Sequence, residues 1–369
     1  MLITNIIAEQ ESGVNRVSAS PGGKSLWFES SDIALRPSPE AFGSALLLPS
    51  LNNGCSLTID NQVNGKWLSN VEQILDIYHE WWGYPKLMPQ SAGCYSGQAR
   101  AEGKTALLFS GGVDSFFSLL RHTETIDALV TVQGFDMPLQ DTTRFAALKS
   151  SLSSIASETG KKSLVIRTNV REHSEFDKVF WERSHGGALA AVGHLLGDSF
   201  GRLLISSSYP NAFQRPWGSH AKTDPLWSSD DLQIVHFGAE FGRIQKLSSI
   251  VHEPLVRKHL RVCWENLSAS GNCSLCEKCL RVRLVLAECG ELINYPGFEG
   301  PDTLAQQIDA LPHTQAFEPL YGQLIKRGRL RPELEGAVRR LLKRSERAES
   351  HSRHLTKRTL RKLLSMAGV

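Results

Sequence analysis

The residues best suited to chemistry form a short glycine loop, Ser110-Gly111-Gly112-Val113-Asp114-Ser115. An apolar run at 106–109 precedes the loop and a mostly apolar segment at 116–120 follows it, which predicts a strand, a turn and a helix in that order. Glycines let a backbone approach a phosphate closely, and the free N–H groups of a helix N-terminus attract its charge. The loop therefore predicts a site that holds a nucleotide by its phosphates. The alternative is a plain glycine-rich turn between a strand and a helix.

A second group of reactive side chains is a cluster of four of the seven cysteines. Its members follow the spacing C-x9-C-x2-C-x2-C and are Cys263, Cys273, Cys276 and Cys279. Thiolates brought together by a tight turn suit a tetrahedral, structural Zn²⁺, and a reducing cytosol argues against disulfides. An iron–sulfur cluster is the main alternative, although the x3-Cys-Pro continuation of bacterial ferredoxins is missing, and unliganded cysteines are a third. The other cysteines are expected to be small buried hydrophobes: Cys55, Cys94 and Cys289.

Strands and helices alternate around the loop, as in a parallel sheet with crossover helices. The strands are expected at 104–109, 128–133, 163–168 and 202–208. The helices are expected at 115–122, 143–158 and 176–197. Ligands of such sheets bind at the carboxyl ends of the strands, which is where the glycine loop would lie.

The flanking segments differ from this middle part, so we expect three segments, 1–100, 101–300 and 301–369. The first is expected to be β-rich, with strand-like runs at 25–29, 45–48 and 56–59. A helix with one apolar face carries Val71, Ile74, Leu75 and Tyr78. The Trp81-Trp82 pair that ends this helix is expected to serve packing or a partner interface.

The last segment is expected to be helical and basic. One helix starts at Pro332 with an apolar face of Leu334, Val338, Leu341 and Leu342, and a second carries Leu355, Leu360, Leu363 and Leu364. Residues 321–369 hold 14 Lys/Arg against 4 Asp/Glu, a charge of +10 that leaves −7 for the rest of the chain. Such a segment either binds nucleic-acid phosphates or is a solvated basic face.

The S-G-G-x-D-S pattern of residues 110–115 resembles the signature loop of the PP-loop ATP pyrophosphatases. With the four cysteines about 150 residues downstream, and Arg281 just after the last of them, the chain resembles the 7-cyano-7-deazaguanine synthase family over residues 104–290. The resemblance implies an α/β, Rossmann-like (HUP-type) parallel sheet with a structural zinc. It also implies ATP cleavage between the α and β phosphates, and conversion of a deazaguanine carboxylate to a nitrile with ammonia.

Three departures leave the acceptor open. The chain has about 100 residues before the loop and a basic extension after the cysteines, and residues 208–220 differ from the family's aspartate-cysteine-arginine substrate segment. Diverged relatives of the synthase lie beside anti-phage defence genes, where another carboxylate can be the acceptor. An amide, a nitrile or a thio derivative is then a conceivable product.

The resemblance implies roles for particular residues. ATP contacts are expected from Ser110, Gly111, Gly112, Val113, Asp114 and Ser115, with Asp114 helping to hold Mg²⁺, and Asp114 and Ser115 are assigned to catalysis. Adenine is expected near Val132 and Phe135. Lys222 and His185 are candidate catalytic cations, with Arg183 as an alternative to His185 and Asp136 as a further candidate, although a Lys or His in a loop is more often simply solvated.

Two other functions fit the sequence. One is a PP-loop tRNA-modifying enzyme that catalyses thiolation or amidation and whose basic tail binds RNA. The other is a non-catalytic ATP-sensing scaffold that recruits a protein partner. The sequence contains no apolar run of the length needed to span a bilayer, so we expect a cytoplasmic protein without membrane contact, and a homodimer is compatible with it.

Overall fold

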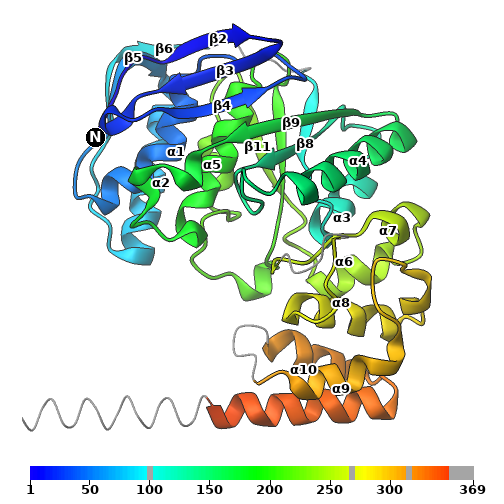
Figure 1. Ribbon diagram of the computed structural model, residues 1–369. Coiled ribbons are helices and arrows are strands. Elements are labelled where there is room, and N and C mark those ends of the chain that lie inside the picture. The colour runs from blue at the N-terminus through cyan, green and yellow to red at the C-terminus, as the bar shows by residue number, and fades with distance from the viewer. Residues whose placement is uncertain (98–102, 266–270, 313–317, 349–369) are drawn as a thin grey trace, which may run out of the picture. The chain divides into compact units, whose positions relative to one another are not determined.

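The computed structural model describes residues 1–97, 103–265, 271–312 and 318–348 (Figure 1). The chain divides into two compact units, Met1–Lys246 and Leu247–Val369. These units do not follow the three segments expected from the sequence. The expected boundary near residue 100 lies inside the first unit, and the expected middle segment is shared between both.

The first unit is built on a mixed eight-stranded sheet with the strand order β11-β10-β7-β8-β9-β4-β3-β2. Its strands are β2 (Ile7–Glu11), β3 (Val14–Ala19), β4 (Leu26–Ser30), β7 (Thr105–Leu108), β8 (Ala128–Gln133), β9 (Lys162–Thr168), β10 (Arg202–Ser206) and β11 (Gln233–Phe237). The five strands from β11 to β9 run parallel, and β4, β3 and β2 extend the sheet in antiparallel fashion. The expected α/β sheet with parallel strands is therefore confirmed, and β11 is a strand that the sequence pattern missed.

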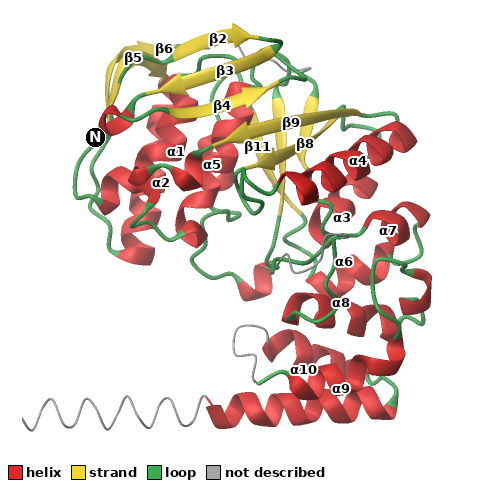
Figure 2. Ribbon diagram, viewed as in Figure 1, coloured by secondary structure: helices red, strands yellow, loops and turns green. Residues whose placement is uncertain are grey.

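Three crossover helices link the parallel strands: α3 (Val113–Arg121), α4 (Thr142–Thr159) and α5 (Trp181–Leu195). Figure 2 shows α3 and α4 on one side of these strands and α5 on the other. On the α3 side, the ring of Phe117 stacks on Phe237 of β11 with centroids 6.1 Å apart. All three helices agree with the sequence expectation within a few residues.

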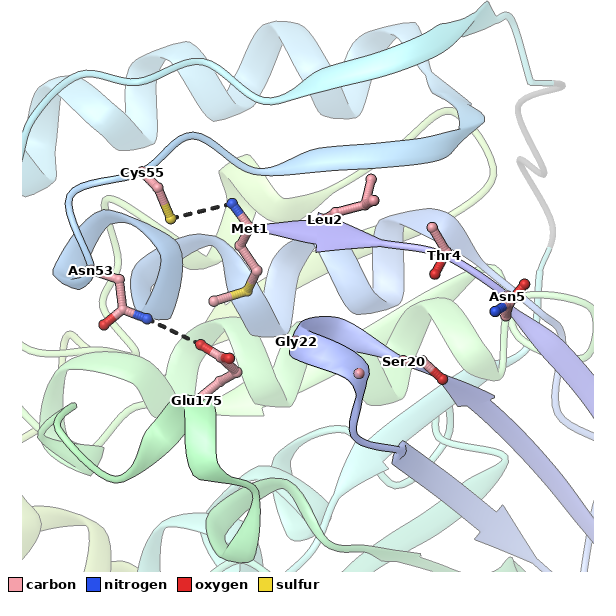
Figure 3. A pocket seen from close by; sticks show the side chains of 10 residues that line it. Met1, Leu2, Thr4, Asn5, Ser20, Gly22, Asn53, Cys55 and Glu175 are labelled. Carbon is pink, nitrogen blue, oxygen red and sulfur yellow. Dashed lines mark hydrogen bonds between the residues drawn. The ribbon is translucent and has the colours of Figure 1, made fainter.

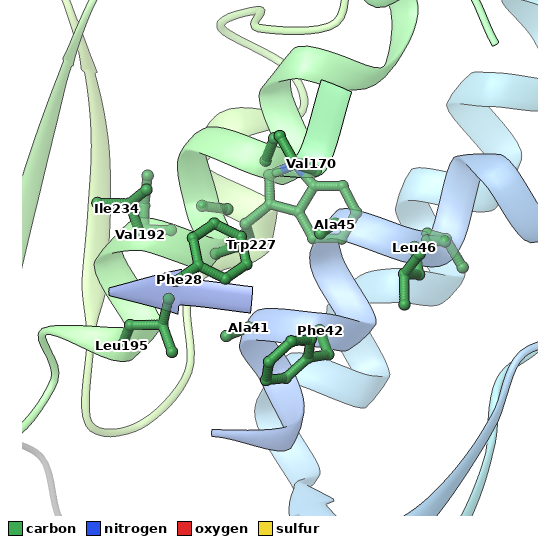
Figure 4. Close-up of a cluster of buried hydrophobic side chains, with 14 of the residues drawn as sticks. Phe28, Ala41, Phe42, Ala45, Leu46, Val170, Val192, Leu195, Trp227 and Ile234 are labelled. Carbon is green, nitrogen blue, oxygen red and sulfur yellow. The ribbon is translucent and has the colours of Figure 1, made fainter. Parts of the chain in front are cut away.

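The N-terminal strands belong to the same sheet as the glycine loop. Phe28 and Glu29 of β4 pair with Thr168 and Arg167 of β9. Figure 4 shows that Phe28 packs beside Phe42 in a core that also holds residues of α5, and the two rings are 6.0 Å apart. The N-terminal part therefore continues the sheet and shares its core.

The first unit also contains a second, parallel sheet of three strands, with the strand order β1-β5-β6. Its strands are β1 (Leu2–Ile3), β5 (Thr58–Asn64) and β6 (Gln90–Tyr95). The helix expected around residues 71–78 is α2 (Gly65–Trp82), and the Trp81 ring at its end packs 4.7 Å from His220. The expected packing role is thereby confirmed for Trp81.

The run at 45–48, expected to be a strand, lies in helix α1 (Pro39–Asn52). Ser38 caps this helix by accepting a hydrogen bond from the Ala41 N–H at 3.3 Å, and almost every residue of the helix is buried. A helix that is apolar on all sides shows no 3.6-residue period, so a short window of it resembles a buried strand. Helix α1 packs on α5, where a Cβ at Gly187 would lie 2.1 Å from the Ser44 carbonyl oxygen. Glycine is therefore needed at this crossing.

The second unit is helical where it is described. Its elements are α7 (Pro254–His259), α8 (Glu277–Glu288), α9 (Leu304–Ala310), α10 (Glu318–Arg327) and a helical stretch over 332–348. Helix α6 (Arg243–Ile250) spans the boundary between the units. The stretch at 332–348 confirms the helix expected from Pro332, and the second expected helix lies outside the described residues.

Candidate functional site

The glycine loop joins the central strand β7 to the N-terminus of α3. Its start is fixed to β8, because the Phe109 N–H donates to the Val130 carbonyl at 2.8 Å and the Thr131 hydroxyl donates to the Phe109 carbonyl at 2.7 Å. Gly111 has a φ of +74°, which strongly favours glycine there. Gly112 is the N-cap of α3 and offers no capping side chain. The first N–H groups of α3 are therefore not capped by the residue that precedes them.

Ser110 and Ser115 flank these glycines in different environments. Ser110 is exposed, whereas Ser115 is buried and donates its hydroxyl to the Gly112 carbonyl at 3.1 Å. Val113 is also buried, so its expected contact with ATP would come from the backbone. The loop thus presents mainly backbone groups and the Ser110 hydroxyl.

Asp114, in the first turn of α3, is held by two cations that the sequence reasoning missed. The Arg243 guanidinium is 2.9 Å from Asp114 Oδ2, and Lys246 Nζ is 3.1 Å from Asp114 Oδ1. Burial alone would raise the pKa of Asp114, but the charges of Arg243 and Lys246 outweigh it and hold this pKa below its ordinary value. Asp114 is therefore ionised, and each of its oxygens already faces a cation. Its expected part in holding Mg²⁺ stays a prediction.

Lys246 is buried, with 2% of its side chain exposed, and also donates to the Ser207 carbonyl at 2.6 Å. Arg243 donates to the Ser208 carbonyl at 3.3 Å. Gly238 has a φ of +86°, and a Cβ there would lie 3.4 Å from the Lys246 ammonium. The backbone at the ends of β10 and β11 thus positions both cations beside the glycine loop.

This cluster lies where the strand order reverses. β7 is bonded to β8 on one side and to β10 on the other, so the chain leaves β7 on one side and returns on the other. The Ser118 hydroxyl of α3 meets the Ser206 hydroxyl of β10 at 2.8 Å. Open α/β sheets bind their ligands in the crevice outside such a switch point, at the carboxyl ends of the strands.

The residues expected near adenine lie at the carboxyl end of β8, the neighbour of β7. Val132 is half-buried in this strand, and Phe135 packs on Trp181 with ring centroids 5.2 Å apart. Gly134 between them has a φ of +101°, and a Cβ there would lie 1.8 Å from the Thr168 carbonyl oxygen. The chain therefore turns tightly here, and the expected contact of Val132 and Phe135 with adenine stays a prediction.

The expected catalytic cations occupy other surroundings. His185 Nδ1 is 3.0 Å from the Trp181 carbonyl, and its Nε2 accepts the Ser219 N–H at 3.2 Å. Burial lowers the pKa of His185, which agrees with a neutral ring that holds the 217–219 segment. Lys222 is exposed, as is Asp136. Catalytic roles for these three residues stay predictions.

The four cysteines come together as the sequence predicted. Their sulfur atoms all lie within 4.8 Å of one another, with Cys263 and Cys276 at 3.9 Å and Cys273 and Cys279 at 3.9 Å. A hydrogen bond with Cys279 lowers the pKa of Cys276 to about 5, which favours the thiolate form. This cluster is able to bind a metal, and four sulfurs at these separations suit Zn²⁺.

Two buried polar side chains form hydrogen bonds to the backbone around the cysteine cluster. Asn272 accepts the N–H groups of Val262 and Cys263 at 2.8 and 3.3 Å and donates to the Leu260 carbonyl at 2.8 Å. Fully buried Arg283 donates to the Ser274 carbonyl at 2.7 Å in the turn between the cysteines. These bonds position the ligands before any metal binds. Of the remaining cysteines, Cys94 is exposed, so its expected burial is wrong, and Cys55 and Cys289 are half-buried.

A cavity of about 690 Å³ lies elsewhere in the first unit, beside β1 (Figure 3). Met1, Cys55 and Asn53 line it together with Glu175, which accepts from Asn53 at 3.0 Å. Glu175 brings a negative charge, and the described residues that line the cavity include no Lys or Arg.

Arginines of the basic C-terminal segment pair with acids where the structure describes them. Arg327 pairs with Glu288 at 2.7 Å and Arg340 with Asp309 at 2.6 Å. Arg339 pairs with Glu335 at 2.6 Å. Glu288 and Asp309 lie outside residues 321–369 and compensate two of the surplus positive charges of this stretch, whereas Glu335 belongs to the stretch itself.

No protein-family model and no curated protein matches the chain. The family resemblance therefore rests on the glycine loop and the cysteines themselves. Among the described helices, none is long and apolar enough to cross a membrane.

Proposed function

We propose that the chain is an ATP-dependent ligase of the PP-loop, 7-cyano-7-deazaguanine synthase type. The observation that carries the proposal is the loop at 110–115. It follows a central strand at the switch point of the five parallel strands of the mixed sheet, and Asp114 holds two cations beside it. In this proposal ATP lies with its phosphates over the loop, between the N-terminus of α3 and the Arg243–Lys246 pair.

The reaction would proceed by attack of an acceptor carboxylate oxygen on the α-phosphorus of ATP. The bond between the α-phosphorus and the bridging oxygen breaks, and pyrophosphate leaves with the electron pair. Negative charge grows on the leaving pyrophosphate, so fixed N–H groups, Arg243 and Lys246 would stabilise it, together with a Mg²⁺ ion bound by the nucleotide. Ammonia then displaces AMP from the acyl adenylate to give a primary amide, and a second ATP-dependent round would dehydrate this amide to a nitrile.

The cysteine cluster would hold a structural Zn²⁺ in the second unit. All four positions are occupied by protein sulfur, so the site leaves no open coordination position for chemistry. The acceptor stays a carboxylate of unspecified carrier, a deazaguanine or a related molecule. Action in an anti-phage or nucleic-acid modification pathway is part of this proposal and rests on the resemblance alone.

ATP binding by the loop is testable with Gly112→Val. The φ of Gly112 is −84°, a value that valine adopts without strain, so the fold should persist. The new side chain would fill the space over the helix N-terminus and weaken ATP binding by about tenfold or more. Isothermal titration with ATP·Mg²⁺ measures the loss.

The matched control is Gly300→Val, because a Cβ at Gly300 would meet open space. We expect wild-type ATP affinity for this control and thermal midpoints within about 3 °C of wild type for both variants. Equal ATP affinity in Gly112→Val and wild type would remove the loop from the nucleotide site.

A further inference from the structure

A second pocket in the first unit is lined by aromatic rings and arginines. It has a volume of about 340 Å³, and its walls include Trp82, Phe180, Glu182, Arg183, Arg215 and Trp217. The Phe180 side of the pocket is open, since 65% of this residue is exposed.

Arg215 is held in place by aromatic faces. Its guanidinium lies 4.8 Å from the Tyr209 ring centroid and 4.6 Å from that of Trp217, and it donates to the Tyr209 hydroxyl at 2.6 Å. Such stacking fixes the plane of the guanidinium and leaves other N–H groups of its fork available. Arg215 is thus a preorganised donor.

Arg183 is held in the same way on the other wall. Its guanidinium lies 5.5 Å from the Trp82 ring and 5.2 Å from the Phe180 ring, and it donates to the Tyr84 hydroxyl at 3.3 Å. Within the described part of the chain, neither Arg183 nor Arg215 forms an ion pair with a carboxylate. This contrasts with the arginines of the C-terminal segment, and both guanidinium charges stay available to an anion.

The pocket is built on the carboxyl edge of the parallel sheet. Arg183 lies in the first turn of α5, and Arg215 and Trp217 follow the end of β10. The Trp217 ring is 5.7 Å from that of His185, whose bond to the Ser219 N–H fixes the segment further. Helix α5 therefore supports the Arg183 wall, and its His185 holds the segment that carries the other wall.

We propose that this pocket binds a nucleoside monophosphate unit, either free or as part of a single-stranded nucleic acid. The aromatic walls supply faces on which a base stacks, and stacking of this kind tolerates any base. The two guanidinium forks match the oxygens of a phosphate, and the Glu182 carboxylate accepts hydrogen bonds from exocyclic amines. A volume of about 340 Å³ is at the small end of ligand pockets and suits one nucleotide.

The experiment titrates the full-length protein with UMP and, separately, with a fluorescein-labelled ten-residue deoxythymidine oligonucleotide. Pyrimidine probes are used so that an adenine site is not measured in their place. Quenching of tryptophan emission reports UMP, and fluorescence anisotropy reports the oligonucleotide. We expect Arg215→Ala and Arg183→Ala each to weaken binding by about tenfold and to lower its salt dependence.

The matched control is Arg16→Ala, because the Arg16 guanidinium also lies over a tryptophan, 4.8 Å from the Trp27 ring, outside this pocket. It should bind both probes as the wild type does. Tighter binding of the oligonucleotide than of UMP identifies a strand as the ligand, and comparable or weaker binding identifies a free nucleotide. Both results support the pocket.

Three results would overturn the proposal. They are failure of both probes to bind at millimolar concentration, wild-type affinity in the two arginine variants, and binding of orotate without binding of UMP, which would mean a carboxylate site. The outcome is independent of ATP cleavage, because these probes carry no triphosphate and the arginine variants leave the 110–115 loop intact.

Discussion

Replacing Asp114 by Asn is expected to lower the rate of AMP formation by about 100-fold or more while leaving ATP affinity within a few-fold of wild type. The carboxylate is the shared partner of Arg243 and Lys246, at 2.9 and 3.1 Å, and an amide cannot neutralise either of them. Both cations would stay near the phosphates and still attract them. They would no longer be fixed where charge develops in the transition state.

The variant Lys246→Met distinguishes the positioning of the two cations from their contribution to ATP binding. Methionine is a flexible, apolar side chain that suits the buried stem of Lys246, but it removes one of the two cations, so both ATP affinity and turnover should fall. The controls are Asp76→Asn and Lys149→Met, two exposed residues far along the sequence from the cluster. Turnover by Asp114→Asn equal to that of wild type would show that the cation pair has no part in catalysis.

Replacing Cys279 by Ser is expected to abolish metal binding and to lower the thermal midpoint of the second unit by about 10 °C or more. Cys279 is fully buried, and its sulfur lies 3.9 Å from that of Cys273. Without a metal, three thiols and a hydroxyl would crowd a small site that no longer joins the turn at 273–276 to α8. Mass spectrometry of the metal content and differential scanning calorimetry measure the two effects.

Cys94→Ser is the matched control, because Cys94 is exposed and lies far from the cluster in sequence. It should keep one zinc ion per chain and the wild-type midpoint. If the wild-type protein contains iron and absorbs visible light, the cysteines hold an iron–sulfur cluster instead of zinc. That result would favour a sulfur-transfer enzyme. A metal-free wild-type protein that is as stable as one reconstituted with zinc would show that the cysteines hold no structural metal.

The parts of the fold that the sequence revealed are those with strong local signals. The strand, glycine turn and helix at 105–121 follow from an apolar run, two glycines and a helical face, and the structure has them in that order. Three of the clustered cysteines follow from spacing, because x2 separations keep ligands within one turn, and Cys263 joins them from ten residues upstream. In both cases neighbouring residues decide the local geometry.

The cation pair could not be found in the same way, because it depends on contacts between distant segments. Arg243 and Lys246 reach Asp114 across about 130 residues of sequence. The available signal was the short run Ile234-Val235-His236-Phe237 followed by Gly238, which marks β11. A fifth parallel strand would have placed the residues after it at the same edge as the glycine loop.

The sequence also could not reveal that the N-terminal strands join the main sheet, for a related reason. Antiparallel pairing of β4 with β9 depends on the register of residues more than 130 positions apart, and a local pattern carries no trace of it. Helix α1 was mistaken for a strand because its residues are buried on every side. Tertiary packing decided both features.

The central claim is that ATP is cleaved between its α and β phosphates at the 110–115 loop. The most direct test follows [α-³²P]ATP and Mg²⁺ with the purified protein and a low-molecular-weight cell extract as the source of acceptor, and separates the labelled products by chromatography. The proposal predicts labelled AMP, an equal amount of labelled pyrophosphate in a parallel reaction with [γ-³²P]ATP, and little of either from Lys246→Met. Labelled ADP as the product, or AMP formed no faster by the wild type than by Lys246→Met, would contradict it.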